Sequence, residues 1–187
     1  MSDCTYDLLQ LVADLRQITG EEFDESRIVR RVAPLVRKFA ETSRLVTETH
    51  DRHDESQGFT LHLLHEEPDH SNAVFLFAWL PGRGTPAHNH KTWGVVVGIE
   101  GEERETWWRR IDDGMRPGYA QLDRVSERRL TPGGISSFLS DDIHTVWNDT
   151  DSVSWSLHVY GRHINHTGRS EFDPVAKTEK AYVLNVE

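Results

Sequence analysis

Apolar side chains near the start of the chain recur at helical spacing. Over residues 6–18 an apolar residue comes every three or four positions, which predicts an amphipathic helix. Gly20 follows and predicts the end of this helix, since glycine commonly terminates helices. The apolar positions that carry the pattern are Leu8, Leu9, Val12, Leu15 and Ile18.

A second helical pattern begins after Asp24. Aspartate is a favourable N-cap because its carboxylate accepts a hydrogen bond from a free amide of the first turn. Ile28 and Val32 follow at helical spacing. Pro34 lacks a backbone donor, so we expect the helix to break there or a further helix to begin. Together the two patterns predict a helical cap over residues 1–45.

After the helical cap the pattern changes to short runs rich in β-branched and aromatic residues. Turn compositions such as PGRGTP and TPGG separate these runs, which predicts strands joined by tight turns. Many short strands in series predict a mainly β sandwich or small barrel, here over residues 58–161. We expect a mostly irregular C-terminal tail over residues 162–187. The predicted strands cover residues 59–64, 73–80, 94–99, 106–111, 153–160 and, in the tail, 181–186.

Size and charge limit the classes of function. The chain has 187 residues, 36% of them hydrophobic, so we expect a single domain over residues 1–187. Its net charge of -10 would repel a phosphate backbone, so nucleic acid is not an expected partner. The N-terminus lacks the basic and apolar segments of a signal peptide, and no stretch reaches the roughly 18 apolar residues of a membrane span. We therefore expect a cytoplasmic protein without a membrane partner, while the oligomeric state stays open.

Three of the eleven histidines lie in a context typical of metal ligands. His88 and His90 follow a turn and enter a predicted strand, in which alternate side chains point to the same face. Two neutral imidazoles rarely suffice to hold an ion, so a third ligand must come from another strand. His144, just before the final predicted strand, is the best candidate. The only cysteine is Cys4, so a metal here must be bound by histidine or carboxylate.

These histidines carry a resemblance to a known family. The pattern G-x5-H-x-H, followed by H-x3-N, is similar to the two signature segments of cupins. The stretch TPAHNHKTWGVVVGIEG and the later SLHVYG resemble the thiol dioxygenases of the cysteine dioxygenase family, especially the bacterial 3-mercaptopropionate dioxygenase type. The resemblance covers residues 58–175. It implies a cupin fold, that is, a double-stranded β-helix or jelly-roll barrel, behind the N-terminal helical cap.

The resemblance implies that His88, His90 and His144 bind Fe(II). Many cupins add a glutamate ligand, but the matching position is Gly94, which agrees with the three-histidine site of thiol dioxygenases. Three neutral imidazoles leave adjacent positions on the ion open, so a thiolate and O2 can bind side by side. Zinc also fits three histidines, but it lacks the redox chemistry that O2 activation needs.

Polar residues alternate along the final predicted strand. Ser156, His158 and Tyr160 share one face, which is either the solvent face of an edge strand or a hydrogen-bonded row inside the barrel. Thiol dioxygenases carry serine, histidine and tyrosine beside the iron at this spacing. By that resemblance Tyr160 would donate a hydrogen bond to bound oxygen, His158 would orient Tyr160, and Ser156 would orient His158.

The resemblance also implies a thiol substrate that carries a carboxylate, which needs a local cation. Arg169 matches the position of an arginine that the bacterial 3-mercaptopropionate type uses near its site. Leu61 departs from the family, because cysteine dioxygenases have an arginine at this position and the mercaptopropionate type has a glutamine. Leucine cannot donate to a carboxylate, so the identity of the thiol stays open.

Three functions are compatible with the sequence. The first is an iron-dependent thiol dioxygenase that converts a small carboxylated thiol, such as 3-mercaptopropionate or cysteine, and O2 into the sulfinic acid. The second is a cupin dioxygenase or hydrolase that acts on another small acid or a diketone. The third is a cupin that binds a metal or ligand without turnover. The row of Ser156, His158 and Tyr160 favours an enzyme, because binding alone does not require an oriented relay.

Other histidines and tryptophans have simpler interpretations. The pairs His62 with His65 and His163 with His166 lie in polar sequence without ligand spacing, so we expect them at the surface. Tryptophans most often fill a core. Trp93, next to the predicted metal strand, is the one that we expect to line the site.

Overall fold

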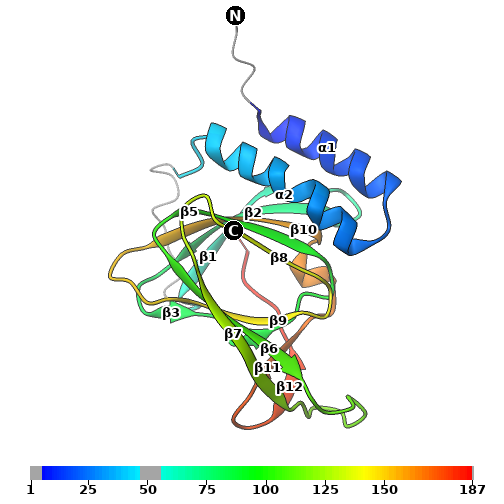
Figure 1. Ribbon diagram of the computed structural model, residues 1–187, viewed down its shortest axis with the longest axis vertical. Coiled ribbons are helices and arrows are strands. Elements are labelled where there is room, and N and C mark those ends of the chain that lie inside the picture. The colour runs from blue at the N-terminus through cyan, green and yellow to red at the C-terminus, as the bar shows by residue number, and fades with distance from the viewer. Residues whose placement is uncertain (1–5, 47–55, 187) are drawn as a thin grey trace, which may run out of the picture.

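Two antiparallel sheets and two helices make up the part of the chain that the computed structural model describes, residues 6–46 and 56–186. Cys4 lies outside these residues. Helices α1 (Leu8–Glu21) and α2 (Glu25–Thr42) lie together against one sheet, and the second sheet lies on the side away from them (Figure 1). Neither helix combines the length and the apolar character that a membrane crossing requires.

The strand order is that of a jelly-roll barrel. One sheet has the order β1, β2, β10, β5, β8, and the other has the order β12, β11, β4, β9, β6, β7, with the short β3 paired to β9. Neighbouring strands are antiparallel and mostly distant in sequence, which confirms the expected mainly β fold with helices at its N-terminus. The bounds are β1 Phe59–His65, β2 Ser71–Trp79, β3 Arg83–Gly84, β4 Ala87–His88, β5 Gly94–Glu100, β6 Glu103–Arg110, β7 Leu122–Leu130, β8 Ile135–Phe138, β9 Ile143–Asn148, β10 Ser154–Arg162, β11 Ser170–Asp173 and β12 Thr178–Ala181.

Helix α1 begins with a capping box. The Asp7 carboxylate accepts a hydrogen bond from the Gln10 amide, and the Gln10 side chain accepts one from the Asp7 amide. The helix runs past Gly20 to Glu21, so the prediction that Gly20 ends it is wrong. A glycine terminates a helix where it takes the left-handed conformation, and Gly20 does not take it.

Asp24 caps helix α2 as predicted, since its carboxylate accepts a hydrogen bond from the Arg27 amide at 3.0 Å. The helix continues through Pro34, so the predicted break is wrong. Pro34 and Arg30, one turn earlier, are both exposed. The turn in which Pro34 leaves the Arg30 carbonyl group without a donor therefore lies on an exposed side of the helix, where proline costs less than in a buried turn.

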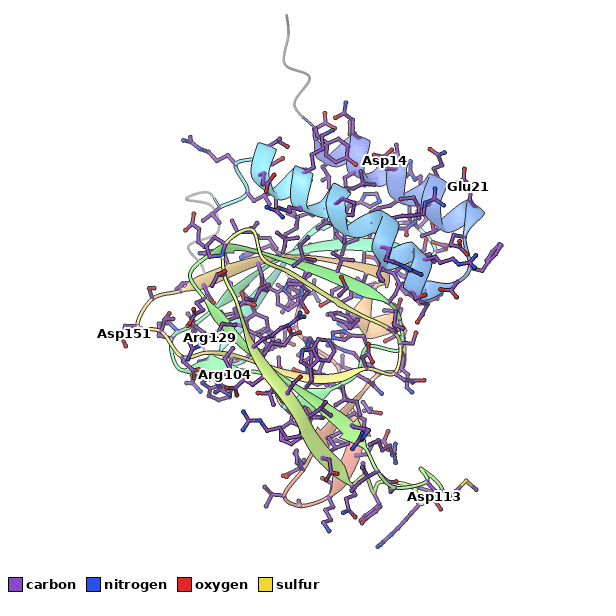
Figure 2. All side chains as sticks on the ribbon, viewed as in Figure 1. Asp14, Glu21, Arg104, Asp113, Arg129 and Asp151 are labelled. Carbon is purple, nitrogen blue, oxygen red and sulfur yellow. The ribbon has the colours of Figure 1, made fainter. Side chains whose placement is uncertain are left out.

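Strand alternation divides the buried residues of the first sheet between two cores. Val95 and Val97 pack against the helices, whereas Val96 between them packs inside the barrel. Side chains fill the space between the two sheets (Figure 2). The labelled Asp14 and Glu21 lie on helix α1, outside this space. The helices thus cover an apolar sheet face without entering the barrel.

Trp93 belongs to the core on the helix side, where it is 5% exposed. The prediction that it lines the site is therefore wrong. Its indole lies against Gly161, where an added Cβ would come within 2.3 Å of the indole nitrogen. Glycine at this position is required by the close approach of the ring.

The structure corrects several strand predictions. Strand β6 begins at Glu103 rather than at residue 106, and the tail predicted to be irregular contains β11, β12 and the 3-10 helix η2 (Ile164–His166). The strand predicted at residues 181–186 is replaced by β12, which ends at Ala181. Strand β7 was missed because its interior residues are all exposed, which leaves no alternation in the sequence.

Leu15 and Leu9 provide a matched test of the helical cap. Leu15 is fully buried against the sheet, whereas Leu9, on the same helix, is 79% exposed. Leu15→Ala should lower the free energy of unfolding by about 2–5 kcal/mol, because it leaves a cavity. Leu9→Ala should change it by less than about 0.5 kcal/mol. Urea denaturation measures both values, and equal effects would contradict the packing described.

Candidate metal centre

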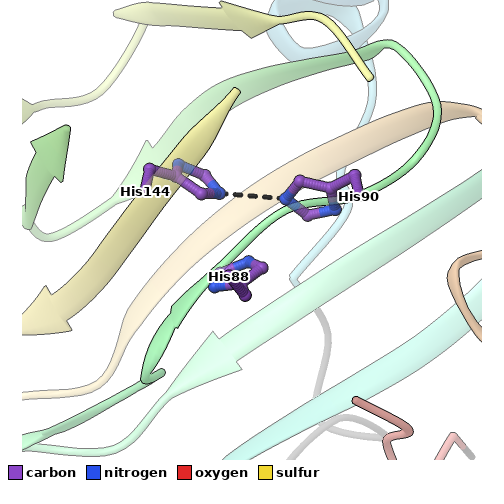
Figure 3. A group of neighbouring side chains, drawn as sticks. All are labelled: His88, His90 and His144. Carbon is purple, nitrogen blue, oxygen red and sulfur yellow. Dashed lines mark hydrogen bonds between the residues drawn. The ribbon is translucent and has the colours of Figure 1, made fainter. Parts of the chain in front are cut away.

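Three imidazoles converge inside the barrel. His88 ends the short strand β4 and pairs with His144 of β9, while His90 lies two residues beyond β4. The predicted strand at the His-x-His pair is thus shorter than expected, yet the rings still lie side by side (Figure 3). One nitrogen from each histidine lies within 4.8 Å of the other two, and all three residues are buried.

Hydrogen bonds at the rear of two rings assign their tautomers. The Nδ1 of His88 lies 3.0 Å from the Pro86 carbonyl oxygen, and the Nδ1 of His144 lies 2.7 Å from a Glu105 carboxylate oxygen. Both nitrogens must donate, so the lone pairs of His88 and His144 are on Nε2, and the Nε2 atom of His144 lies within hydrogen-bond distance of His90.

The spacing of the ring nitrogens fits a common ion. His90 Nε2 and His144 Nε2 are 2.9 Å apart. Two nitrogens that bind one ion at right angles, each at about 2.1 Å, are about 3 Å apart. Burial, aided by the charges of neighbouring histidines, lowers the pKa of His88 and of His90 well below its usual value. The rings of His88 and His90 are therefore neutral at neutral pH, which is the form that binds metals.

Glu105 supports this group from behind, and no pattern in the sequence revealed it. Its carboxylate accepts hydrogen bonds from His144, from Arg128 at 2.7 Å and from Ser136 at 2.8 Å. Burial by itself would raise the pKa of Glu105, but the bonds and charges of His144 and Arg128 lower it to about 2. A carboxylate that holds a ligand histidine fixes the ring and strengthens it as a donor.

A second buried carboxyl group, Glu103, lies two residues earlier on β6. It is 3% exposed. Burial raises its pKa to about 8, against the lowering effect of a hydrogen bond with Ser156, and the charge of Glu105 raises it further. Glu103 and Glu105 are two positions apart, as residues on the same face of a strand are. The strand predicted from the sequence begins only at residue 106, so the pattern was not recognised.

Ser156, His158 and Tyr160 form a hydrogen-bonded row on the inner face of β10. The Ser156 hydroxyl lies 2.8 Å from His158 Nε2, and His158 Nδ1 lies 2.8 Å from the Tyr160 hydroxyl. All three are buried, so this face is not a solvent face. Trp79 donates from its indole to Ser156 at 3.0 Å and closes the outer end of the row.

Arg169 reaches the same space from the segment after η2. It is 2% exposed, its Nε donates to the Tyr182 carbonyl oxygen at 3.2 Å, and its guanidinium carbon lies 4.4 Å from the centre of the Tyr182 ring. Its Nη2 is buried without a hydrogen-bond partner among the residues that the structure describes. Burial lowers the pKa of Arg169, but arginine stays charged in proteins. An unpaired, charged donor therefore faces the interior.

The main chain fixes Arg169 relative to the histidines. Asn89, between His88 and His90, exchanges two hydrogen bonds with Ser170, next to Arg169. The Asn89 amide donates to the Ser170 carbonyl at 3.1 Å, and the Ser170 amide donates to the Asn89 side chain at 2.8 Å. Strand β11 continues this contact by pairing with β4.

The cavity between these groups is small. It offers about 10 Å³ to a water-sized sphere, which is room for about one water or ion. Any larger ligand therefore requires side chains of the wall to move. A larger hollow, about 590 Å³, lies elsewhere and is lined by none of the three histidines. The inner cavity is lined by Phe77, Trp79, Thr85, His88, His90, His144, Val146, His158, Tyr160, Arg169 and Leu184.

Other predicted positions differ from the expectation. His163 is buried against Phe75, so its predicted surface position is wrong, and burial lowers its pKa. His166 is exposed and stacks on His70 at 3.6 Å with nearly parallel rings. Glu66 is near enough to complete a second group of metal-ligand type. Parallel stacked rings, however, direct their nitrogen lone pairs side by side rather than toward one ion.

A two-sheet barrel with three inward imidazoles defines a metal-binding protein of the cupin class. Residues 5–169 match the family described as cysteine dioxygenase type I. The chain belongs to this family, whose members are thiol-oxidising oxidoreductases. A metal site at His88, His90 and His144 agrees with that membership.

Several solved structures are similar to part of this chain. Oxalate oxidase in complex with glycolate shares 15% identity over 63% of this chain, with a TM-score of 0.47, and this chain spans 59% of its length. The protein TT1209 from Thermus thermophilus shares 19% identity over 63% of this chain and 96% of its own, with a TM-score of 0.44. A double-stranded β-helix protein from Klebsiella pneumoniae shares 14% identity over 70% of this chain and 98% of its own, with a TM-score of 0.47.

Replacing Glu105 tests its support of the metal ligands. Glu105→Gln keeps the size of the side chain but removes the charge that faces His144, so the affinity for Zn²⁺ or Co²⁺ should fall about 10–100-fold. Titration calorimetry at pH 7 measures this. Glu102→Gln, one strand position outside β6, is the control and should leave the affinity unchanged. Equal affinity in all three proteins would show that Glu105 has no role in binding.

The buried carboxyl group of Glu103 predicts a pH dependence of stability. Its pKa rises from an ordinary 4.5 to about 8 on folding. Between these values the folded protein holds one more proton than the unfolded chain, so the free energy of unfolding falls as pH rises, by up to about 1.4 kcal/mol per pH unit. Urea denaturation from pH 5 to 8 should show a shallower slope for Glu103→Gln. Parallel slopes would contradict the shift.

Proposed function

We propose that this protein is an iron-dependent thiol dioxygenase of the cytoplasm that converts a small carboxylated thiol and O2 into the sulfinic acid. The observation that carries the proposal is the meeting of three chemical groups at one cavity. These are three imidazoles, the hydroxyl group of Tyr160 and the guanidinium of Arg169, whose Nη2 has no hydrogen-bond partner among the described residues. Membership of the cysteine dioxygenase family supports the reaction class.

Fe(II) held by His88, His90 and His144 would supply the redox chemistry for O2 and favour the deprotonated form of the thiol. The three side chains add no negative charge of their own at this position. A thiolate is therefore attracted to the site electrostatically, and no separate protein base is needed to hold it in the anionic form.

Tyr160 would serve as a hydrogen-bond donor beside the reacting groups. Burial raises the pKa of Tyr160, so its hydroxyl keeps its proton at neutral pH. His158 holds the phenol oxygen at 2.8 Å, and Ser156 holds His158 in turn. A donor already oriented in a nearly dry cavity stabilises developing negative charge without reorganising.

Arg169 would bind the substrate carboxylate. Leu61, at the position of the family's usual polar residue, is fully buried among aromatic side chains and offers no donor. The Nη2 of Arg169 does offer one, and the stacking of the guanidinium on Tyr182 keeps it in place. The cation would thus come from the segment after β10 rather than from β1, which favours a thiol of the 3-mercaptopropionate type.

Oxygen consumption tests the reaction class. The protein is loaded with Fe(II) without air and supplied with 3-mercaptopropionate, cysteine, mercaptosuccinate or cysteamine. A carboxylated thiol should drive iron-dependent O2 uptake with formation of the sulfinic acid. His144→Ala should abolish it, and His166→Ala, a control in an exposed histidine, should not. Wild-type protein that binds iron but consumes no thiol would refute the dioxygenase function.

A comparison of a thiol that has a carboxylate with one that lacks it tests whether Arg169 binds the substrate carboxylate. Arg169→Gln should raise KM for 3-mercaptopropionate about 10–100-fold, the value of one lost charged hydrogen bond. KM for cysteamine, which has no carboxylate, should stay within about twofold. Steady-state kinetics measures both. A rise by the same factor for both thiols would assign Arg169 a structural role instead.

A further inference from the structure

The wall of the inner cavity contains one residue that belongs to neither sheet. Most of the wall lies on strands β2, β4, β9 and β10, and Thr85, His90 and Arg169 lie within two residues of a strand. Leu184 comes instead from the segment after β12, which ends at Ala181. Neither main-chain group of Leu184 pairs with another main chain among the described residues. Leu184 can therefore leave the wall without separating two paired strands.

Residues 182–186, which we call the strap, place alternate side chains inside the barrel. Tyr182 and Leu184 are each 8% exposed and belong to the barrel core, and Val186 packs against that core. Val183, between the first two, is 70% exposed. Figure 1 shows this segment in red, running from β12 toward the space between the two sheets. The strap thus forms part of the barrel wall through its inward side chains.

Two side-chain amides hold the strap in place. The Asn165 side chain accepts from the Leu184 amide at 3.0 Å and donates to the Leu184 carbonyl oxygen at 2.8 Å. The Gln57 side chain holds Asn185 in the same way, accepting from its amide at 2.9 Å and donating to its carbonyl oxygen at 3.4 Å. Each amide side chain thus takes the place that a neighbouring strand would have.

The first residue of the strap is anchored more firmly than the rest. The Tyr182 amide donates to the Arg169 carbonyl oxygen at 3.0 Å, and the Arg169 Nε donates to the Tyr182 carbonyl oxygen at 3.2 Å. The guanidinium also stacks on the Tyr182 ring. A segment that is held by few hydrogen bonds outside a sheet opens at a lower free energy than paired strands do. Residues 183–186 can therefore open while Tyr182 stays in place.

We propose that residues 183–186 are a gate to the metal centre, held closed by Asn165 and Gln57, and that Leu184 limits the size of the ligand that the centre accepts. The cavity has room for about one water or ion, so any further ligand needs such an opening. The gate admits any small ligand of the metal centre. Its use in thiol oxidation rests on the proposed function.

The position of the gate favours small anions. Leu184 and Arg169 line the same cavity, and Arg169 also holds the anchored end of the strap. The Nη2 of Arg169 is buried without a hydrogen-bond partner among the described residues. An anion that enters where Leu184 leaves the wall therefore meets a charged donor inside the same cavity.

Azide binding to the Co²⁺-loaded protein tests the gate without any turnover, because azide changes the visible absorbance of Co²⁺. Stopped-flow mixing measures the association rate. Asn165→Ala should raise this rate about tenfold, since it removes two hydrogen bonds that hold the gate closed. Leu184→Ala should also raise it, because the cavity is then larger. The controls are Val183→Ala, in the outward residue of the strap, and Thr167→Ala, whose hydroxyl donates to the Ile164 carbonyl oxygen. Both should bind azide at the wild-type rate.

Urea denaturation shows which variants are folded. If Asn165→Ala is not folded, Gln57→Ala takes its place, with the same expected rise, because it also removes two hydrogen bonds to the strap. Equal rates in wild type, in the amide variant and in Leu184→Ala would overturn the proposal. An equal acceleration in Thr167→Ala would overturn it as well, because the effect would then not depend on the strap.

Steady-state kinetics tests whether Leu184 limits the size of the thiol. The substrate 3-mercaptobutyrate is 3-mercaptopropionate with one more methyl group. In Leu184→Ala the ratio of kcat/KM for the larger thiol to that for the smaller one should rise about tenfold, the effect of one such group in a tight pocket. Val183→Ala should keep the wild-type ratio. An unchanged ratio in Leu184→Ala would show that Leu184 does not limit size. If wild type oxidises neither thiol, the proposed function fails, and the azide rates alone still decide whether the gate exists.

Discussion

The barrel interior holds ionisable side chains in a space nearly closed to water, and each of them must find a partner there. An unpaired polar group in such a place costs free energy, and an unpaired charge costs more. The inner face of β10 meets this condition with a row of hydrogen bonds, and β6 meets it with two carboxyl groups. The metal centre is built from these pairings.

The two carboxyl groups of β6 show how environment separates similar residues. Glu105 faces Arg128 and His144, and these partners keep it ionised despite its burial. At Glu103 burial prevails, and the charge of Glu105 raises the pKa further. One residue therefore holds a ligand ring as an anion, and the raised pKa of the other favours its neutral acid. The same amino acid has opposite pKa shifts two positions apart on one strand.

Where polar groups lack a partner, the structure indicates what the cavity is suited to bind. His90 Nδ1 and Arg169 Nη2 are buried without hydrogen bonds in the described part of the chain. The Nε2 atoms of His90 and His144 meet 2.9 Å apart among the imidazoles. A cation among the imidazoles and an anion against Arg169 would satisfy most of these groups together. The contact between Asn89 and Ser170 keeps the two sites adjacent.

Much of this architecture follows from local patterns in the sequence. Helical spacing and the N-cap Asp24 predict the helical cap, and the alternation of Ser156, His158 and Tyr160 predicts a shared face. A side chain's periodicity and the preferences of helix ends depend only on near neighbours, so they can be read without the fold. The three histidines were also identified in this way, with the family resemblance supplying their role.

Tertiary contacts decided what such patterns do not encode. The burial of His163, the position of Trp93 under the helices and the partnership of Glu105 with His144 depend on which strands pair and in which register. The interior residues of strand β7 are exposed, so its sequence shows no alternation. Pro34 stays within α2 on an exposed side of the helix. The sequence by itself determined the elements and the candidate ligands. Only the folded barrel decided which buried carboxyl group faces which histidine, because that choice is set by contacts between residues far apart in the chain.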